Sequence, residues 1–98
     1  MDFPPIPVKR DEGEVLMVVQ VFAEADGTIV FGIKMVLGEI TARPKAWLKA
    51  VREEVAKLEA IAREAGCHEM RIAGRDWSRV LPDYEHCFGL RNGLRKRL

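Results

Sequence analysis

The stretch that decides the fold runs from Thr41 to Arg75 and reads TARPKAWLKAVREEVAKLEAIAREAGCHEMRIAGR. Apolar residues recur in its first two thirds at steps of three and four, the spacing that lines one face of an α-helix. These residues are Leu48, Val51, Val55, Leu58, Ala62 and Ala65, with Trp47 and Ile61 widening the stripe. Pro44 suits the first turn of a helix, and Gly66 suits the left-handed position just past its end. The pattern predicts one long helix at about residues 45–65, packed by one face on a broad apolar surface.

The residues before this helix predict a β-hairpin. Residues 15–23 and 28–37 are rich in β-branched and aromatic side chains and flank Asp26-Gly27, a strong signal for a two-residue turn. Such a turn pairs positions whose numbers sum to 53, so that Phe22 faces Phe31, Gln20 faces Ile33 and Val18 faces Met35. One side then carries Leu16, Val18, Phe22, Phe31, Ile33, Met35 and Leu37, and the other carries Met17, Val19, Val21, Ala23, Val30 and Val36.

Both sides of this predicted ribbon are apolar, which is typical of strands in a sheet that is covered on both faces. One helix covers one face only. We therefore expect a second subunit or another partner protein over the other face.

Shorter elements complete the predicted domain, which spans residues 1–98. Residues 1–14 hold three prolines and predict an N-terminal arm with an edge strand at Ile6–Lys9, followed by a turn. Residues 69–73 alternate like a strand with one buried side, and residues 77–81 predict a short helix that Pro82 stops. The tail, residues 85–98, fits a second hairpin or one strand with a bulge. The fold class is α/β (mixed α+β), with a central, mostly antiparallel sheet.

The composition and charge of the chain limit the classes of function that fit it. With 48% hydrophobic and 32% charged residues, the chain is typical of a globular domain, and its net charge of +1 gives no general attraction to nucleic acid or to an anionic membrane. The longest apolar run, residues 15–19, is too short to cross a bilayer, and the N-terminus lacks the features of a signal peptide. Cys67 and Cys87 are expected to be free thiols of an intracellular protein, although a disulfide between them stays open.

No catalytic or metal-binding set emerges from the residues. Cys67-His68 and His86-Cys87 offer four potential zinc ligands, but adjacent residues on a strand point to opposite faces. Ser78 is the only serine, so a serine–histidine–acid triad is not indicated. The basic tail, Arg91, Arg95, Lys96 and Arg97, fits either phosphate contacts or, in the preferred interpretation, a solvated edge strand.

The least ordinary stretch is Gly74–Arg79. Arg75 and Arg79 bracket Trp77, and Tyr84 follows shortly after. Arginine and tryptophan are enriched at binding hot spots, which makes these four residues the candidate partner-binding surface, although a structural interpretation of the stretch is slightly preferred. In the alternative interpretation Trp77 plugs the end of the sheet and Arg75 pairs with a carboxylate.

The same region carries a family resemblance. The pattern Ala62-xxx-Gly66-Cys67, followed by Ile72-x-Gly74-Arg75, Trp77, Arg79, Leu81 and Tyr84, resembles the C-terminal half of GNAT-fold (acyl-CoA N-acyltransferase-like) proteins. It is similar in particular to the small divergent members encoded by bacteriophages and prophages, and it covers about residues 28–98. The resemblance implies that residues 28–37 form the central strand, residues 45–65 the helix after it, and residues 69–73 the strand that splays from it.

The chain departs from this family at the cofactor loop. GNAT enzymes hold the pyrophosphate of coenzyme A at the start of that helix, with a Gln/Arg-x-x-Gly-x-Gly/Ala loop whose free N–H groups meet the anion. Residues 38–44 read GEITARP here: Glu39 would repel a phosphate, and Pro44 removes an N–H donor. Arg43 alone does not restore the site. The first strand and first two helices of the family, which wall the acceptor site, have no counterpart in residues 1–14.

These observations predict a non-catalytic, phage-type GNAT-like domain that acts through protein contacts as a virion-associated or assembly component. Its place would be the host bacterial cytoplasm or the virion, and its partner another virion or assembly protein, a further copy of itself, or both. No cofactor, metal or membrane is expected. A first alternative is a minimal N-acetyltransferase that uses acetyl-CoA, with Tyr84 as general acid, because a tyrosine after the splayed strand often has this role in the family. A second alternative is a nucleic-acid-binding module that uses the arginine-rich tail and Trp77.

Overall fold

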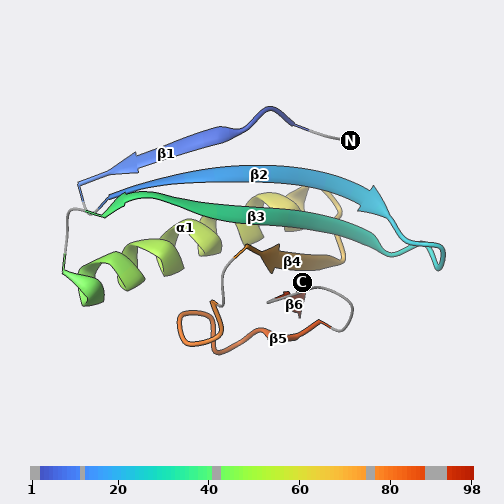
Figure 1. Cartoon of the computed structure of the whole chain (residues 1–98). Coiled ribbons are helices and arrows are strands. Elements are labelled where there is room, and N and C mark those ends of the chain that lie inside the picture. The colour runs from blue at the N-terminus through green and yellow to red at the C-terminus, as the bar shows by residue number, and fades with distance from the viewer. Residues whose placement is uncertain (1–2, 12, 41–42, 75–76, 88–92) are drawn as a thin grey trace.

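The computed structural model describes residues 3–11, 13–40, 43–74, 77–87 and 93–98, without the side chains of residues 35–40 and 44. Its elements are β1 (Ile6–Arg10), β2 (Gly13–Ala23), β3 (Ile29–Ile40), α1 (Pro44–Glu64), β4 (Glu69–Ala73), β5 (Glu85–His86) and β6 (Leu94–Arg97). The strands form one sheet in the order β1-β2-β3-β4-β6-β5, in which β3 and β4 are parallel and the other neighbours are antiparallel (Figure 1). The predicted mixed class, with a mostly antiparallel sheet and one long helix, is confirmed for these residues.

The long helix lies along one face of the sheet (Figure 1). It begins and ends one residue earlier than predicted, at Pro44 and Glu64. Its buried stripe holds Trp47, Ala50, Val51, Val55 and Ala62. Ile61 was predicted to widen this stripe, but its side chain is 55% exposed. The reason is geometric: Ile61 lies about 100° around the helix from the buried Ala62, which turns it away from the sheet.

A glycine ends the helix as predicted. Gly66 has a φ of +83°, its N–H donates to the carbonyl of Arg63 (3.1 Å), and the N–H of Cys67 donates to the carbonyl of Ala62 (2.9 Å). This pair of bonds is a Schellman motif, which satisfies the last helical carbonyls and reverses the chain. The reversal sends β4 back beside β3, so that β3, α1 and β4 form a parallel crossover unit.

The hairpin between β2 and β3 has a different register from the predicted one. Glu24 N donates to Thr28 O (2.8 Å), which closes a loop of three residues rather than two. Gly27 takes the left-handed position of that loop with a φ of +90°, and Asp26 Oδ1 accepts from Thr28 N (2.9 Å). Phe31 therefore faces Val21 instead of Phe22, and the other predicted pairs are wrong by the same step.

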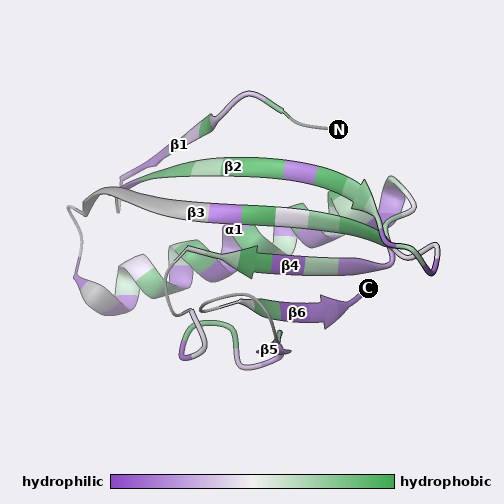
Figure 2. Cartoon of the chain, turned by 45° about the vertical axis from the view of Figure 1, so that its right-hand side comes forward, coloured by the Kyte–Doolittle hydropathy of each residue, from purple (hydrophilic) through white to green (hydrophobic). Residues whose placement is uncertain are grey.

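This one-residue change reassigns the two faces of the sheet. The face under α1 carries Val15, Met17, Val19, Phe31 and Ile33 from β2 and β3, and Met70, Ile72 and Leu94 from β4 and β6, all buried. The opposite face carries Leu16 and Val18, which are exposed, and Lys34; towards the β2–β3 turn it also carries Phe22, which is half-buried, and Val30, which is fully buried. Figure 2 shows the hydrophobic residues concentrated on β2 and hydrophilic residues dominating β6. The prediction that α1 covers one face is confirmed, whereas the predicted membership of each face is wrong.

The chain after β4 contains turns where a short helix was predicted. The N–H groups of Val80 and Leu81 both donate to the carbonyl of Trp77 (2.9 and 3.0 Å), and Tyr84 N donates to Leu81 O (3.1 Å). One helical turn forms but does not extend, because Pro82 follows and has no N–H to donate. The tail then pairs β5 with β6 antiparallel, which agrees with the second-hairpin interpretation; residues 88–92 between them lie outside the described residues.

The N-terminal arm confirms the predicted edge strand, because β1 pairs antiparallel with β2. The turn predicted at Asp11–Glu14 is shorter, since β2 already begins at Gly13. In the part of the chain that the structure describes, no helix has the length and apolar character needed to span a membrane.

Candidate functional site

The four residues predicted to bind a partner do not form one exposed surface. Arg75 lies outside the described residues, and Arg79 is exposed. Trp77 and Tyr84 are only 4% and 9% exposed and belong to the core cluster. The placement of Trp77 agrees with the alternative in which it plugs the end of the sheet. Buried side chains offer no contact area, so a docking surface centred on Trp77 and Tyr84 lacks support in this structure.

Tyr84 instead takes part in a buried polar cluster, which we call the Glu59 cluster (Glu59, Tyr84 and Lys96). The Tyr84 hydroxyl donates to Glu59 Oε1 at 2.7 Å, and Lys96 Nζ donates to both carboxylate oxygens at 3.3 and 3.2 Å. Lys96 Nζ also lies 5.7 Å from the centroid of the Tyr84 ring. Glu59 is 8% exposed, so its charge is buried but satisfied by a hydroxyl and an ammonium group.

The cluster joins three parts of the chain: α1, the turn segment 77–84 and β6. A second bond supports the same junction, because Arg52 Nε on α1 donates to the carbonyl of Val80 (2.9 Å). A cavity of about 310 Å³ opens beside it and is lined by Arg52, Val55, Glu59, Leu81, Asp83 and Lys96 among others. The basic residues of its wall already have partners within the protein. Lys96 forms ion pairs with Glu59 and Asp83, and Arg52 donates to the carbonyl of Val80.

The environment of Tyr84 bears on the alternative that it is a general acid. Burial raises the pKa of Tyr84 far above its usual range, and the hydrogen bond to Glu59 raises this pKa further. A general acid works best with a pKa near the operating pH, with its proton aimed at the leaving group. The proton of Tyr84 is aimed at Glu59 instead. This geometry suits a structural tie better than proton transfer.

The region of the missing cofactor loop is only partly described. β3 continues to Ile40 and α1 begins at Pro44; Arg43 has an extended conformation, and no side chain among the described residues caps the helix. The side chain of Glu39 and residues 41–42 lie outside the described residues. The predicted repulsion of phosphate by Glu39 therefore stays a prediction.

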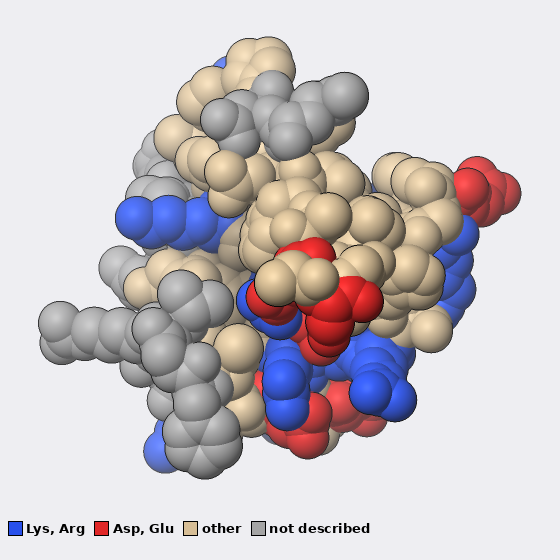
Figure 3. Space-filling view, turned by 90° about the vertical axis from the view of Figure 1, so that its right-hand side faces the viewer, with Lys and Arg blue, Asp and Glu red and all other residues tan. Residues whose placement is uncertain are grey.

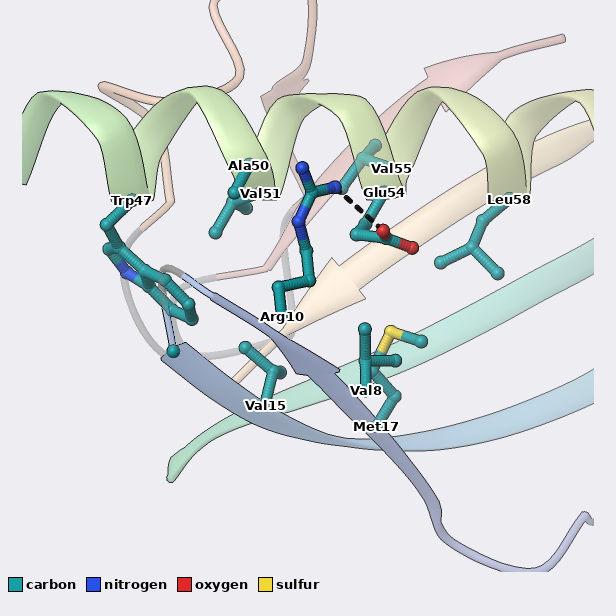
Figure 4. Close-up of a pocket in the computed structure, with 11 residues that line it drawn as sticks. Val8, Arg10, Val15, Met17, Trp47, Ala50, Val51, Glu54, Val55 and Leu58 are labelled. Atoms are coloured by element: carbon teal, nitrogen blue, oxygen red, sulfur yellow. Dashed lines mark hydrogen bonds and ion pairs between the residues drawn. The ribbon is translucent and has the colours of Figure 1, made fainter. Parts of the chain in front are cut away.

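A narrow apolar cavity lies between β1, β2 and α1 (Figure 4). Val8, Val15 and Met17 face Trp47, Val51, Val55 and Leu58 across it. Arg10 closes one side, because its guanidinium bonds Glu54 (2.9 Å) and Glu53 (3.0 Å) on the helix. The volume is about 20 Å³, roughly the room of one water molecule, so this cavity is a packing gap and not a cofactor site.

The structure also shows the surroundings of the two cysteines and of His68. Cys67 is buried, Cys87 is half-buried, and both are free thiols. Burial raises the pKa of the Cys67 thiol, which makes it a poorer nucleophile. His68 Nδ1 accepts a hydrogen bond from Ile29 N (2.9 Å), so this nitrogen serves the backbone of β3.

The strongest candidate for contacts with a partner is the sheet face that α1 does not cover. We call it the uncovered face and define it by Pro7, Lys9, Glu14, Leu16, Val18 and Lys34, which share one side of β1–β3. Leu16 and Val18 are 40% and 39% exposed. Lys9, Glu14 and Lys34 form no ion pair with the described residues. Sequence reasoning missed this grouping because the register assumed for the turn put Leu16 and Val18 with Phe31 and Ile33.

Comparisons of the sequence with protein-family models and with curated proteins, and of the chain with solved structures, found no match.

Proposed function

We propose that this chain is a non-catalytic, GNAT-like domain that acts through protein–protein contacts, and that its uncovered face binds a second copy of the chain. The observation that carries the proposal is the exposure of Leu16 and Val18 on the sheet face that α1 does not cover, where they lie at the other end of the strands from the buried Val30. A sheet normally buries an apolar face against another element. A partner that supplied the missing layer would remove both side chains from water.

Two observations support a GNAT-like domain without catalysis. The order of β3, α1 and β4, with the two strands parallel, agrees with the order that the sequence resemblance implies. The implied splay of residues 69–73 is not seen, because all five residues of β4 pair with β3. Tyr84, the general acid of the alternative function, is buried and donates its proton to Glu59. The proposed likeness to the GNAT family rests on the sequence pattern at residues 62–84 and on this order of elements.

The charges on the uncovered face favour a second copy over a strongly charged partner. Lys9 and Lys34 are positive and Glu14 is negative, and none of them pairs with a described residue. A surface that carries unpaired charges of both signs around an apolar centre can be complementary to itself across a twofold axis. The edge of β1 is a poorer route to association, because Pro7 and the prolines before it discourage the addition of a strand there.

Substitution on the uncovered face tests the proposal. The double variant Leu16→Lys/Val18→Lys places two charges at the centre of the interface and is expected to be monomeric in sedimentation experiments. Ile61→Lys is the matched control, since Ile61 is an equally apolar residue, 55% exposed, on the helix and away from this face. The control should associate like the wild type. Loss of association in both variants, or in neither, would contradict the assignment of this face.

The virion-associated role is the part of the proposal that depends on the resemblance to phage proteins alone. It predicts that the chain is detected by mass spectrometry in purified particles of a phage that encodes it, or in their assembly intermediates. Its absence from both would remove the virion from the proposal and leave self-association unaffected.

A further inference from the structure

A third cavity, lined mainly by polar and charged residues, lies at the end of the sheet where the β2–β3 turn, the start of β4 and the end of β6 meet. Its volume is about 410 Å³, and its wall includes Glu24, His68, Glu69, Arg71, Arg95 and Arg97. Figure 3, which looks at this end of the molecule, shows acidic and basic side chains gathered together below a largely uncharged region. We call this the arginine cavity. Ligand pockets commonly fall in a range of about 300–1,000 Å³.

Strand register places the three arginines side by side. Arg71 on β4 is directly opposite Arg95 on β6, and Glu69 is directly opposite Arg97. Like charges opposite each other on neighbouring strands are destabilising unless other groups compensate them. Arg71 is compensated, because it forms ion pairs with both Glu24 and Glu69, and its guanidinium also lies over the Phe22 ring, 5.9 Å from the centroid.

The acidic groups of the cavity are therefore already engaged. Glu24 and Glu69 both bind Arg71. Asp26 Oδ1 accepts from the N–H of Thr28, and this hydrogen bond lowers the pKa of Asp26, so it too has a partner.

Several donors of the cavity are not engaged. Arg97 forms no hydrogen bond or ion pair with the described residues. Arg95 binds the exposed Glu85 through Nε at 2.9 Å, which leaves the two terminal nitrogens of its guanidinium for another ligand. Because His68 Nδ1 accepts from Ile29 N, the proton of the neutral ring sits on Nε2. The groups of this wall that have no partner are thus hydrogen-bond donors, and those of Arg95 and Arg97 are also positively charged.

We infer that the arginine cavity binds an oxyanion, a phosphate or carboxylate group of a small ligand, through the guanidinium groups of Arg97 and Arg95. The planar fork of a guanidinium matches two oxygens of either group, and such charge-assisted pairs are among the stronger hydrogen bonds in proteins. The His68 ring supplies a further donor at the same wall. By strand register these arginines lie on the same side of the sheet as Leu16 and Val18, but Arg95 and Arg97 are on β6, two strands beyond β3. The inference is argued from the charges around the cavity and does not rest on the proposed function.

The test is a titration of the ¹⁵N-labelled protein followed by NMR, with inorganic phosphate in one arm and acetate in the other, at ionic strength held constant with sodium chloride. Saturable shifts at Arg97, His68 and Thr28 are expected. Saturation by phosphate alone assigns the site to phosphorylated ligands, and saturation by acetate assigns it to carboxylates.

Two variants and a control make the test specific. Arg97→Gln and Arg95→Gln should each weaken binding by roughly tenfold, as expected for loss of one charge-assisted contact. Arg79→Gln makes the same change of charge on the turn segment 77–84, outside the cavity wall, and should bind like the wild type. Shifts that rise linearly with both anions would overturn the inference. Saturation that neither arginine substitution in the cavity weakens would also overturn it.

Discussion

The hydroxyl of Tyr84 and the carboxylate of Glu59, 25 residues apart in the chain, are joined by a buried hydrogen bond of 2.7 Å. The bond fixes the turn segment after β4 to the middle of α1. A second bond between this segment and the helix runs from Arg52 Nε to the carbonyl of Val80.

Tyr84→Phe should therefore destabilise the fold while leaving its shape intact. Removing a hydrogen bond to a buried charged group costs about 1.5–3 kcal/mol, because the carboxylate keeps its burial and loses a donor. Urea unfolding measures the change. Arg79→Gln, an exposed substitution in the same segment, is the control and should stay within about 0.5 kcal/mol of the wild type. An equally small change for Tyr84→Phe would show that the bond does not hold the segment.

Alkaline pH should weaken the fold through the same tyrosine. The pKa of folded Tyr84 is raised, so its contribution to stability is complete below the unfolded value near 10.0 and is lost as the pH rises above it. Cys67 acts in the same direction from its ordinary value near 9.0. Since Tyr84 is the only tyrosine, the ultraviolet absorbance of tyrosinate reports on it alone. Folded protein should show no ionisation near pH 10, and urea should restore it; ordinary titration of the folded protein would contradict the burial described here.

Trp77 distinguishes a core role from a docking role. Trp77→Ala should lower the free energy of unfolding by about 3–5 kcal/mol, as expected for a large buried aromatic side chain. Trp77→Phe should lose clearly less, because it keeps most of the apolar volume and removes an indole N–H that is buried with no partner among the described residues. Unchanged melting of Trp77→Ala together with lost association would instead restore Trp77 as a partner-binding residue.

Acetyl-CoA provides the test of the enzymatic alternative. The non-catalytic proposal predicts that any heat of binding in a calorimetric titration of the chain with acetyl-CoA comes from its phosphate groups in the arginine cavity and is weakened in Arg97→Gln. Phosphate binding in the arginine cavity is a separate event, and the Arg97→Gln variant separates the two. Micromolar binding that persists in Arg97→Gln would point to a retained cofactor site and would contradict the proposal.

The sequence was most informative where the structure is local. The apolar stripe, Pro44 and Gly66 specify α1 to within one residue at each end, because helix contacts and caps involve residues close in sequence. The mixed class and the position of the edge strand β1 also followed from local patterns.

The hairpin register was harder to predict from the sequence, because it depends on the length of a single turn. Asp26-Gly27 is compatible with a two-residue turn and with the observed three-residue loop, in which Glu24 pairs with Thr28 and Asp26 accepts from Thr28 N. Because of that difference of one residue, Phe31 faces Val21 instead of Phe22, and the predicted register did not group the residues of the uncovered face together. The arginine cavity could not be predicted from the sequence for another reason. β6 lies between β4 and β5, and no local pattern indicates that Arg95 lies opposite Arg71.

The mass of the wild-type chain in solution, measured by light scattering over a range of concentrations, tests the central claim most directly. Association through the uncovered face predicts a mass that rises with concentration towards twice the 11.1 kDa of one chain. A mass that stays at 11.1 kDa at every concentration would contradict the proposal that a second copy covers Leu16 and Val18.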